Sequence, residues 1–503
     1  MRSYFAFLMV LVCATVNAQN INDVLRYGTE SLQGTARFQG LSGAFGAVGG
    51  DMSAININPA GSAVFNNSLF TISGTNYNRN NDATYFNRTS TTELNSADIN
   101  QLGGAFVFKN TDDNSNWKKI TLAINYDLVE NFDNEVFITG NSNQGIDNYF
   151  LNFAQGVPLE PLRVQDGEFI EDAYLDIGAN LGFADQQAFL GFQGGIIDPV
   201  EDNGDNTAYI SNAEYSTVNQ EYLRRTSGYN GKFTLNLATQ YQKNLFFGAS
   251  LNFHTVLYEQ VTLFDESGYD PSSPIQFTTF DNFLRTDGWG FSYSLGAIAK
   301  LNENIRIGGS YQSPTWYRLR DDFSQRINSD FPDINPEIDF INFNIVNLFD
   351  EYTVEIPEKF TGSAAIIFGK DGLLSFDYSY QDMSQAELLP NSDPNFSSEN
   401  AFIATVLRPV SSYRAGGEFR IGLVSLRGGY RFEQSPFEDE TTVGDLVGYS
   451  AGIGYNFGGS RLDLAVNRTE QDVNQQLFDT GVTTPALVNN INTNVTLGFT
   501  VNF

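Results

Sequence analysis

Hydrophobic and polar residues alternate one by one through the last segment of the chain, residues 491–503. One face carries Ile491, Thr493, Val495, Leu497, Phe499, Val501 and Phe503, and the other carries Asn492, Asn494, Thr496, Gly498, Thr500 and Asn502. Successive side chains of a β-strand point to opposite faces, so this pattern predicts a strand with one apolar and one polar face. Such a strand fits the wall of a barrel that separates lipid from a polar lumen.

The same alternation recurs upstream and predicts fourteen strands. They lie near 69–78, 102–109, 118–128, 229–242, 245–264, 281–301, 305–320, 350–368, 373–382, 411–420, 424–432, 446–457, 461–469 and 491–503. Tight connections alternate with long ones, which are 79–101, 129–228, 265–280, 321–349, 383–410, 433–445 and 470–490. An even strand number with short periplasmic turns and long external loops is typical of a bacterial outer-membrane barrel.

The fold class that we predict is therefore all-β, a 14-stranded antiparallel transmembrane β-barrel. The mean hydropathy of −0.25 also suits a large soluble all-β protein. Aromatic residues at 14% and 46 glycines favour the barrel. The terminal Phe503 resembles the signal by which barrel assembly machinery recognises outer-membrane barrels. The expected location is the outer membrane of a Gram-negative cell, multi-pass, with both termini periplasmic and with membrane lipid and lipopolysaccharide around the wall.

The first residues have the pattern of a signal peptide, residues 1–18. Arg2 is followed by the apolar run 5–12 and by Val16-Asn17-Ala18 before the expected cleavage at Gln19. The apolar run is shorter than the roughly 20 residues that span a bilayer as a helix. The only cysteine is Cys13, inside this leader, so the mature chain has no cysteine for a disulfide or a metal site.

The net charge of −31 argues against nucleic-acid binding, which needs a basic surface. Acidic runs such as 438–440 lie in the long loops, and the ligand spacing of an EF-hand is absent. His254 is the only histidine, so the sequence offers no zinc site and no bis-histidine haem site. We expect neither a metal nor a cofactor.

Two segments do not show the strand pattern. Residues 19–66 are rich in glycine and alanine, and 144–192 lie in the longest predicted loop yet carry many apolar residues, Phe169 and Phe183 among them. An exposed apolar loop needs a partner. Residues 144–192 are therefore expected either to pack on the barrel mouth or to capture a hydrophobic ligand.

The N-terminal segment also carries a family resemblance. Residues 38–48 (FQGLSGAFGAV) lead into 51–61 (DMSAININPAG), which resembles the plug of the FadL/TodX family of outer-membrane transporters of hydrophobic compounds. The segments 305–314, 356–362, 412–418, 426–430 and 435–436 resemble later parts of the same family. The long loop at 129–228 matches poorly, so no ligand contact is carried over to it.

The resemblance implies passive uptake of long-chain fatty acids or other hydrophobic small molecules. A hatch formed by 19–66 would fill the barrel formed by 67–503, with the long extracellular loop at 129–228, and the ligand would leave sideways through a gap in the wall. Asn58, Pro59 and Ala60, with Gly43 and Gly46, are the expected plug and gating residues. The alternative for the Asn-Pro-Ala turn is a purely structural seat for the plug, since Asn-Pro is a common turn former.

Strand parity places four arginines in the lumen, where they are candidates for binding a ligand carboxylate. They are Arg306, Arg414, Arg427 and Arg431. The alternative is that they pair with lumenal acids such as Asp377, Glu418 and Asp463, because charges in a low-dielectric interior need partners. Phe169 and Phe183 are the candidate apolar ligand contacts.

Residues 448–452 (GYSAG) match the nucleophile-elbow pattern of hydrolases around Ser450. That motif needs a strand-turn-helix context, whereas here it lies within a predicted continuous strand. We therefore expect no enzyme, although a lipid hydrolase remains a third hypothesis. The second is a surface binding or adhesion protein anchored by its barrel, which would have no need of a mobile hatch.

Overall fold

The computed structural model describes residues 19–112, 114–330, 341–342 and 346–503. The predicted signal peptide lies outside these residues. No helix in the described part of the chain is long and apolar enough to cross a membrane.

One antiparallel sheet closes on itself because β1 (Leu69–Tyr85) pairs with both β2 (Arg88–Lys109) and β22 (Ala486–Asn502). The strands between them are β3 (Trp117–Asn131), β4 (Asn134–Ser142), β7 (Val218–Tyr241), β8 (Leu245–Ser267), β9 (Phe277–Lys300), β10 (Ile305–Gln312), β11 (Thr315–Ser329), β14 (Tyr352–Ile356), β15 (Lys359–Phe368), β16 (Gly372–Asp382), β17 (Glu387–Leu389), β18 (Pro409–Ile421), β19 (Val424–Glu433), β20 (Leu446–Asn456) and β21 (Ser460–Gln475). The short strands β12 (Ile341–Asn342) and β13 (Asn347–Leu348) pair with β11.

Across the described residues these strands form fourteen rows around the closed wall, and we call each row, whether it is one strand or two strands in line, a stave. The number of staves confirms the predicted fold class. Four staves are interrupted and are each assigned as two strands, β3/β4, β10/β11, β14/β15 and β16/β17. The last strand has the predicted faces, since Leu497 and Phe499 are exposed on the outside while Asn494 and Thr496 are buried inside. The alternation thus reports the lipid-facing and lumen-facing sides of the wall.

The barrel is taller than predicted. Residues 79–101 were expected to be a loop, but they continue the β1–β2 hairpin to a tight turn at Phe86 and Asn87, which have φ of 44° and 62°. Likewise, β4 pairs with the first part of β7 inside the predicted loop 129–228. The outward residues of the upper hairpin, such as Asn78 and Asp82, are polar. A strand without an apolar face lacks the signal on which the prediction relied.

The N-terminal segment lies inside the barrel. It comprises α1 (Ile21–Gly28), α2 (Ala36–Gln39) and the 3₁₀ turns η1 (Ser53–Asn56) and η2 (Pro59–Val64). Three wall carboxylates hold it: Asp377 accepts from the backbone of Phe45 and Gly46, Glu418 from Arg37, and Asp127 from Ser53 and Asn56. The plug is therefore bonded to two regions of the wall, to β3 and to the neighbouring strands β16 and β18.

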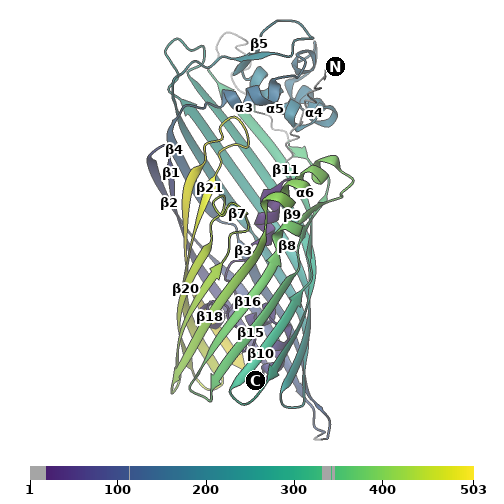
Figure 1. Cartoon of the computed structure of the whole chain (residues 1–503), viewed down its shortest axis with the longest axis vertical. Helices are drawn as coiled ribbons and strands as arrows, with labels where there is room; N and C mark the ends of the chain where they lie inside the picture. Colours follow the sequence, from purple (N-terminus) through teal and green to yellow (C-terminus); the bar gives the residue numbers. More distant parts are fainter. Residues whose placement is uncertain (1–18, 113, 331–340, 343–345) are drawn as a thin grey trace, which may run out of the picture.

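A helical cap covers one end of the barrel (Figure 1). It comprises α3 (Asp147–Ala154), η3 (Glu160–Leu162), α4 (Ile170–Asn180), α5 (Phe183–Gln193) and the hairpin β5 (Ile197–Pro199) with β6 (Tyr209–Ser211). Its buried Phe150 and Phe189 share one apolar core with Phe264 and Phe280 of the wall. Most apolar residues of this segment thus pack on the barrel mouth, the first of the two predicted alternatives.

Candidate functional site

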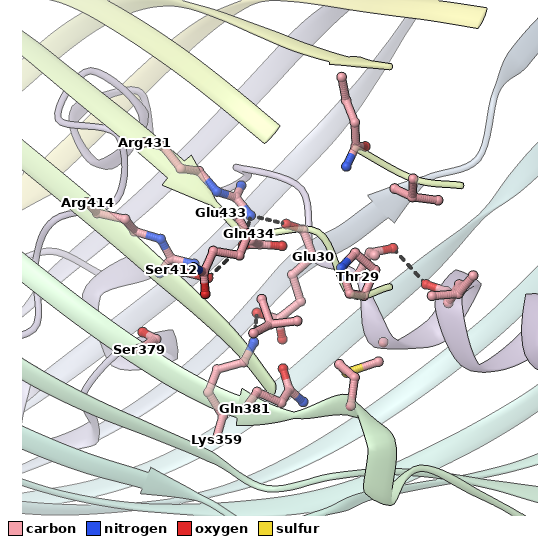
Figure 2. A pocket seen from close by; sticks show the side chains of 17 residues that line it. Thr29, Glu30, Lys359, Ser379, Gln381, Ser412, Arg414, Arg431, Glu433 and Gln434 are labelled. Atoms are coloured by element: carbon pink, nitrogen blue, oxygen red, sulfur yellow. Dashed lines mark hydrogen bonds and ion pairs between the residues drawn. The ribbon is translucent and has the colours of Figure 1, made fainter. Parts of the chain in front are cut away.

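A small cavity of about 80 Å³ lies between the plug and the barrel wall. Leu25, Gly28, Thr29 and Glu30 of the plug form one side of it. The other side is formed by residues of β15, β16, β18, β19 and β21 and of the segments that follow β16 and β19, namely Lys359, Ser379, Gln381, Met383, Val410, Ser412, Arg414, Arg431, Glu433, Gln434, Pro436, Val443 and Gln471. Figure 2 shows the charged members of this lining converging on Glu30.

Part of the cavity lining is charged, and its residues come from both the plug and the wall. Lys359 donates from Nζ to Oε2 of Glu30 at 3.0 Å. Arg431 donates from Nη2 to the backbone oxygen of Glu30 at 2.8 Å and to Oε2 of Glu433 at 2.9 Å. The Lys359 ammonium holds the pKa of the Glu30 carboxyl well below its usual range. These contacts tie the plug to β15 and β19.

Arg414 differs from its neighbours in the cluster. It is buried on β18, and its Nε has no hydrogen-bond partner among the described residues. None of the hydrogen bonds or ion pairs found among those residues involves this guanidinium. The carboxylates of Glu433, Glu30 and Asp377 lie near enough to act on its charge, but none of them accepts a hydrogen bond from it among the described residues, so its Nε is free to bind an anion.

The cavity also has an apolar part. Leu25, Met383 and Val410 line it and belong to, or pack against, a larger hydrophobic cluster around α1. The cluster includes Val24, Tyr27, Phe132, Val256, Tyr258, Tyr317, Leu319, Tyr352, Val354, Ile356, Phe396 and Ile403. The helix α6 (Pro394–Val406) and the turn η4 (Met383–Gln385) contribute to it from outside the plug. A molecule with a hydrocarbon tail and an anionic head matches both parts.

The other two predicted arginines do not line this cavity. Arg427 donates to Glu418 and Asp463, each at 2.7 Å, and is thus paired with two of the acids considered as the alternative. Arg306 donates to the backbone oxygen of Val48 in the plug at 2.9 Å. A ligand-binding role for these two residues stays a prediction.

The two candidate phenylalanines belong to the cap. Phe169, at the start of α4, is 73% exposed, and Phe183 packs against Phe153 and Phe323. Neither lines the cavity. Their role in ligand capture stays a prediction.

The Asn-Pro-Ala turn binds a region of the wall where the backbone pairing is continuous. Asn58 donates from Nδ2 to the backbone oxygens of Gly46 at 2.8 Å, Ala297 at 3.0 Å and Gly309 at 3.4 Å, while its Oδ1 accepts from the Ala60 N–H at 3.1 Å. It thus caps η2 and joins it to β9 and β10. Gly46 also donates to Asp377, and an added Cβ would collide with Ser363. Gly43 has a φ of 78°, a conformation that favours glycine.

The wall is interrupted elsewhere, between β2 and the β3/β4 stave. The backbone pairing of β2 with β3 ends at Gln101 and Asp127, and no backbone pairing in the described residues joins β2 to β4. Side chains bridge the upper part instead: Thr92 of β2 and Asn81 of the neighbouring strand β1 donate to the backbone oxygen of Glu135 at 2.6 and 2.7 Å. We call this stretch, 88–100 of β2 opposite 128–137, the side-chain seam.

The plug contacts the seam directly. Asn100 of the seam donates to the backbone oxygen of Gly34 at 2.7 Å, and on the neighbouring strand β1 the Tyr77 hydroxyl donates to Gln33 at 3.0 Å. Phe132, at the break between β3 and β4, packs edge-on against Tyr27 of α1 with ring centroids 6.3 Å apart. A movement of α1 would therefore change the contact between Tyr27 and Phe132 at the seam.

Sequence reasoning missed Glu30 and Lys359. Lys359 is at the start of β15, at a position whose side chain faces the lumen, and within the segment 356–362 that resembles the family. The sequence interpretation considered only arginines as anion ligands. Ser450 lies within β20, and its hydroxyl is 2.8 Å from that of Ser42 in the plug. The motif at 448–452 therefore lies within a continuous strand, as predicted.

A family model described as "Outer membrane protein transport protein (OMPP1/FadL/TodX)" matches residues 206–502, more than half of the chain. The chain belongs to this FadL/TodX family. The family is one of outer-membrane transport proteins and not of enzymes. The matched range excludes the plug, whose assignment rests on its own contacts. No curated protein matches the sequence.

Solved structures share the fold. A FadL homologue from Pseudomonas aeruginosa is 12% identical with a TM-score of 0.53, and the match covers 95% of this chain and 100% of that one. The P. putida toluene transporter TodX is 13% identical with a TM-score of 0.51, and the match covers 94% of this chain and 99% of that one. A plugged FadL/TodX barrel is therefore the architecture of this protein.

Proposed function

We propose that this FadL/TodX-family protein takes up long-chain fatty acids, or similar hydrophobic molecules with one carboxylate, by passive diffusion. The observation that carries the proposal is the buried Arg414 guanidinium, whose Nε has no hydrogen bond among the described residues and which lines a cavity that also has apolar side chains. A carboxylate satisfies a guanidinium through charge-assisted hydrogen bonds, whereas an aromatic hydrocarbon offers Arg414 no acceptor. The cavity supports the carboxylate over the hydrocarbon.

Lateral release is the second part of the proposal. Opening the side-chain seam breaks side-chain hydrogen bonds, while opening any fully paired pair of staves breaks a backbone ladder. The seam lies above Leu102 and Phe106, which are exposed on the outer face of β2 in the apolar belt. A ligand leaving at the lower end of the seam, beside the exposed Ile99, enters the membrane at the upper edge of that belt, because the rest of the seam has a polar outer face.

In the proposed arrangement, residues 1–18 are the signal peptide, 19–66 are the hatch and 67–503 are the barrel. The cap faces the cell exterior, both termini are periplasmic, and lipopolysaccharide surrounds the outer half of the wall. Phe503 serves as the recognition residue for barrel assembly machinery. A plug bonded to the wall through Asp127, Asp377 and Glu418 favours transport over a simple surface anchor.

Binding is tested with purified protein by competition between a fluorescent fatty acid and either oleate, oleyl alcohol or toluene. We expect oleate to bind more tightly than oleyl alcohol, and Arg414→Met to weaken oleate binding roughly tenfold, the size of one charged hydrogen bond. Oleyl alcohol binding should not weaken in this variant. Equal effects of Arg414→Met on oleate and on the alcohol would contradict a carboxylate site.

Release is tested by closing the seam with a thiol cross-linker. The double variant Thr92→Cys/Glu135→Cys spans the seam, while Asn78→Cys/Asn95→Cys joins residues that are already paired in the β1–β2 hairpin. We expect cross-linking to stop oleate uptake by cells in the first variant only. Normal uptake through a cross-linked seam would exclude lateral release at this position.

A further inference from the structure

Arg414 and Arg431 lie directly opposite each other on two paired strands of the barrel wall. They form a cross-strand pair between β18 and β19, and both side chains are buried in the lumen. Like charges in this arrangement destabilise a sheet. Figure 2 shows both side chains extending from the wall toward Glu433 and Glu30. Because the two guanidinium groups repel each other, a negative group bound by both of them would offset that repulsion.

The carboxylates around this arginine pair are bonded to other groups. Asp377 is opposite Arg414 on β16, but it accepts from two backbone N–H groups of the plug. Glu30 accepts from Lys359. Of the two arginines only Arg431 bonds to a carboxylate, and it does so through one nitrogen, Nη2. Among the described residues the arginine pair therefore keeps donors that no acid of the protein uses.

The arginine pair offers more donors than a plain fatty acid uses when its carboxylate binds one arginine. A guanidinium carries five N–H donors, and a carboxylate with both oxygens on one guanidinium satisfies that group alone. A carboxylate bound in this way by Arg414 leaves the Nε of Arg431, which has no hydrogen bond among the described residues, without an acceptor. A buried donor without a partner is unfavourable, so the site suits a ligand with a second acceptor beside its carboxylate.

Glu433 supplies an acceptor beside the same arginines. Ser412 and Arg431 both donate to its Oε2, and no hydrogen bond to its Oε1 is found among the described residues. Glu433 lines the cavity together with Arg414 and Arg431. A group that accepts from Arg431 and also donates to Glu433 is a hydroxyl or a secondary amide.

The cavity has the size and the lining of a head-group site. Its volume is about 80 Å³, and polar side chains outnumber apolar ones along its lining. Leu25, Met383 and Val410 form the apolar part, where an acyl chain begins. A plain fatty acid brings only its carboxylate to the polar part, whereas a larger polar head uses more of that lining.

We propose that the preferred substrates carry a hydroxyl or amide group close to the carboxylate, as hydroxy fatty acids and N-acyl amino acids do. This inference rests on the proposed function, because it assigns the head group of the same site. The carboxylate binds Arg414, while the neighbouring group accepts from Nε of Arg431 and donates to Oε1 of Glu433. A site built to bond such a group discriminates against a ligand that lacks it.

The first test measures the affinities of palmitate, 3-hydroxypalmitate and N-palmitoylglycine by competition with a fluorescent fatty acid on the purified wild-type protein. We expect at least one of the two substituted acids to bind roughly tenfold more tightly than palmitate, the gain from the added hydrogen bonds. The hydroxyl compound and the amide compound tell the two kinds of substrate apart. Equal affinities of all three acids would overturn the proposal.

The second test asks whether Arg431 bonds to the neighbouring group. Arg431→Lys keeps a positive charge beside Glu433 but removes Nε and the planar group that carries it. The measured quantity is the affinity of the tighter substituted acid divided by that of palmitate, because a general loss of folded protein lowers both affinities alike. We expect this affinity ratio to fall from roughly ten toward one.

Arg79→Lys is the matched control for this variant. Arg79 is also buried, and its Nε also has no hydrogen bond among the described residues, but it does not line the cavity. Its affinity ratio should remain that of the wild type. An unchanged ratio in Arg431→Lys, or the same fall in both variants, would overturn the proposal.

The proposed function and this inference fail in different ways. If Arg414→Met weakens palmitate binding but the substituted acids bind no better than palmitate, the carboxylate site stands and the head-group assignment falls. If Arg414→Met weakens none of the three acids, the carboxylate site falls, and the head-group assignment falls with it.

Discussion

Pro59 of the plug lies against Gly248 of β8 so closely that a Cβ atom on Gly248 would come within 3.0 Å of the backbone of Pro59 and Ala60. Gly296 on β9 faces Asn58 and Pro59 in the same way, and Gly308 on β10 faces the backbone of Gly46. Three glycines on neighbouring strands thus form a shallow depression that receives the Asn-Pro-Ala turn. The lack of side chains there lets the two backbones approach.

Gly248→Ala should unseat this turn. The added methyl group overlaps backbone atoms that cannot rotate away, and such overpacking costs about 1–3 kcal/mol. We expect a lower melting temperature of the purified barrel and faster proteolysis of the plug. Gly362→Ala is the matched control, because a Cβ there meets nothing within 4 Å. Equal behaviour of the two variants would show that the depression does not hold the plug.

Asn58→Asp should harm the protein more than Asn58→Ala. Alanine loses a side chain that donates to three backbone oxygens, with a net cost of about 1 kcal/mol for each typical hydrogen bond. Aspartate would place acceptor oxygens against those same carbonyls. Thermal unfolding of the two variants in detergent checks the order, which the reverse ranking would contradict.

The transport role of the turn is tested separately with Asn58→Ala/Pro59→Ala. If the turn couples the plug to release, oleate uptake falls while the barrel still reaches the surface and resists denaturation. Unchanged uptake at wild-type surface levels would remove the motif from the mechanism. Loss of surface expression would assign it the structural role alone.

Arg427→Met and Arg414→Met should differ in their effect on stability, because Arg427 has hydrogen-bonded carboxylate partners and Arg414 has none among the described residues. The first removes a hydrogen bond of 2.7 Å from each of Glu418 and Asp463, which keep Arg37 and Arg461 as partners, and a hydrogen bond to a charged group contributes about 1.5–3 kcal/mol. The second removes no hydrogen bond found among the described residues, so we expect a change within about 1 kcal/mol. Denaturant unfolding of both variants is the measurement, and equal destabilisation would contradict this assignment.

Ser450→Ala should leave any lipid-related activity unchanged. Ser450 lies within the continuous strand β20, with no helix beginning behind it to form an oxyanion hole. The substitution removes only its contact with Ser42. Hydrolysis of acyl esters by the purified wild type, lost in this variant, would show that the hydrolase hypothesis was right.

The sequence by itself determined the barrel. The alternation in 491–503 and its repeats report a wall with lipid on one side and a polar lumen on the other, because side-chain direction in a strand depends only on local position. For the same reason parity placed Arg414 and Arg427 in the lumen. The strand prediction failed for the hairpin at 79–101, because those strands rise beyond the apolar belt and their outward residues are polar.

Only the tertiary structure decided what the inward residues contact. Arg37 meets Glu418 across 381 positions of sequence, and no local pattern encodes such a partner. The position of the plug in the closed wall decides three features of the site. Arg427 bonds to Asp463, the Nε of Arg414 has no hydrogen bond among the described residues, and Glu30 lies beside Lys359. Local periodicity sets the direction of a side chain, whereas its partner is set by the packing of distant segments, and the candidate site depends on partners.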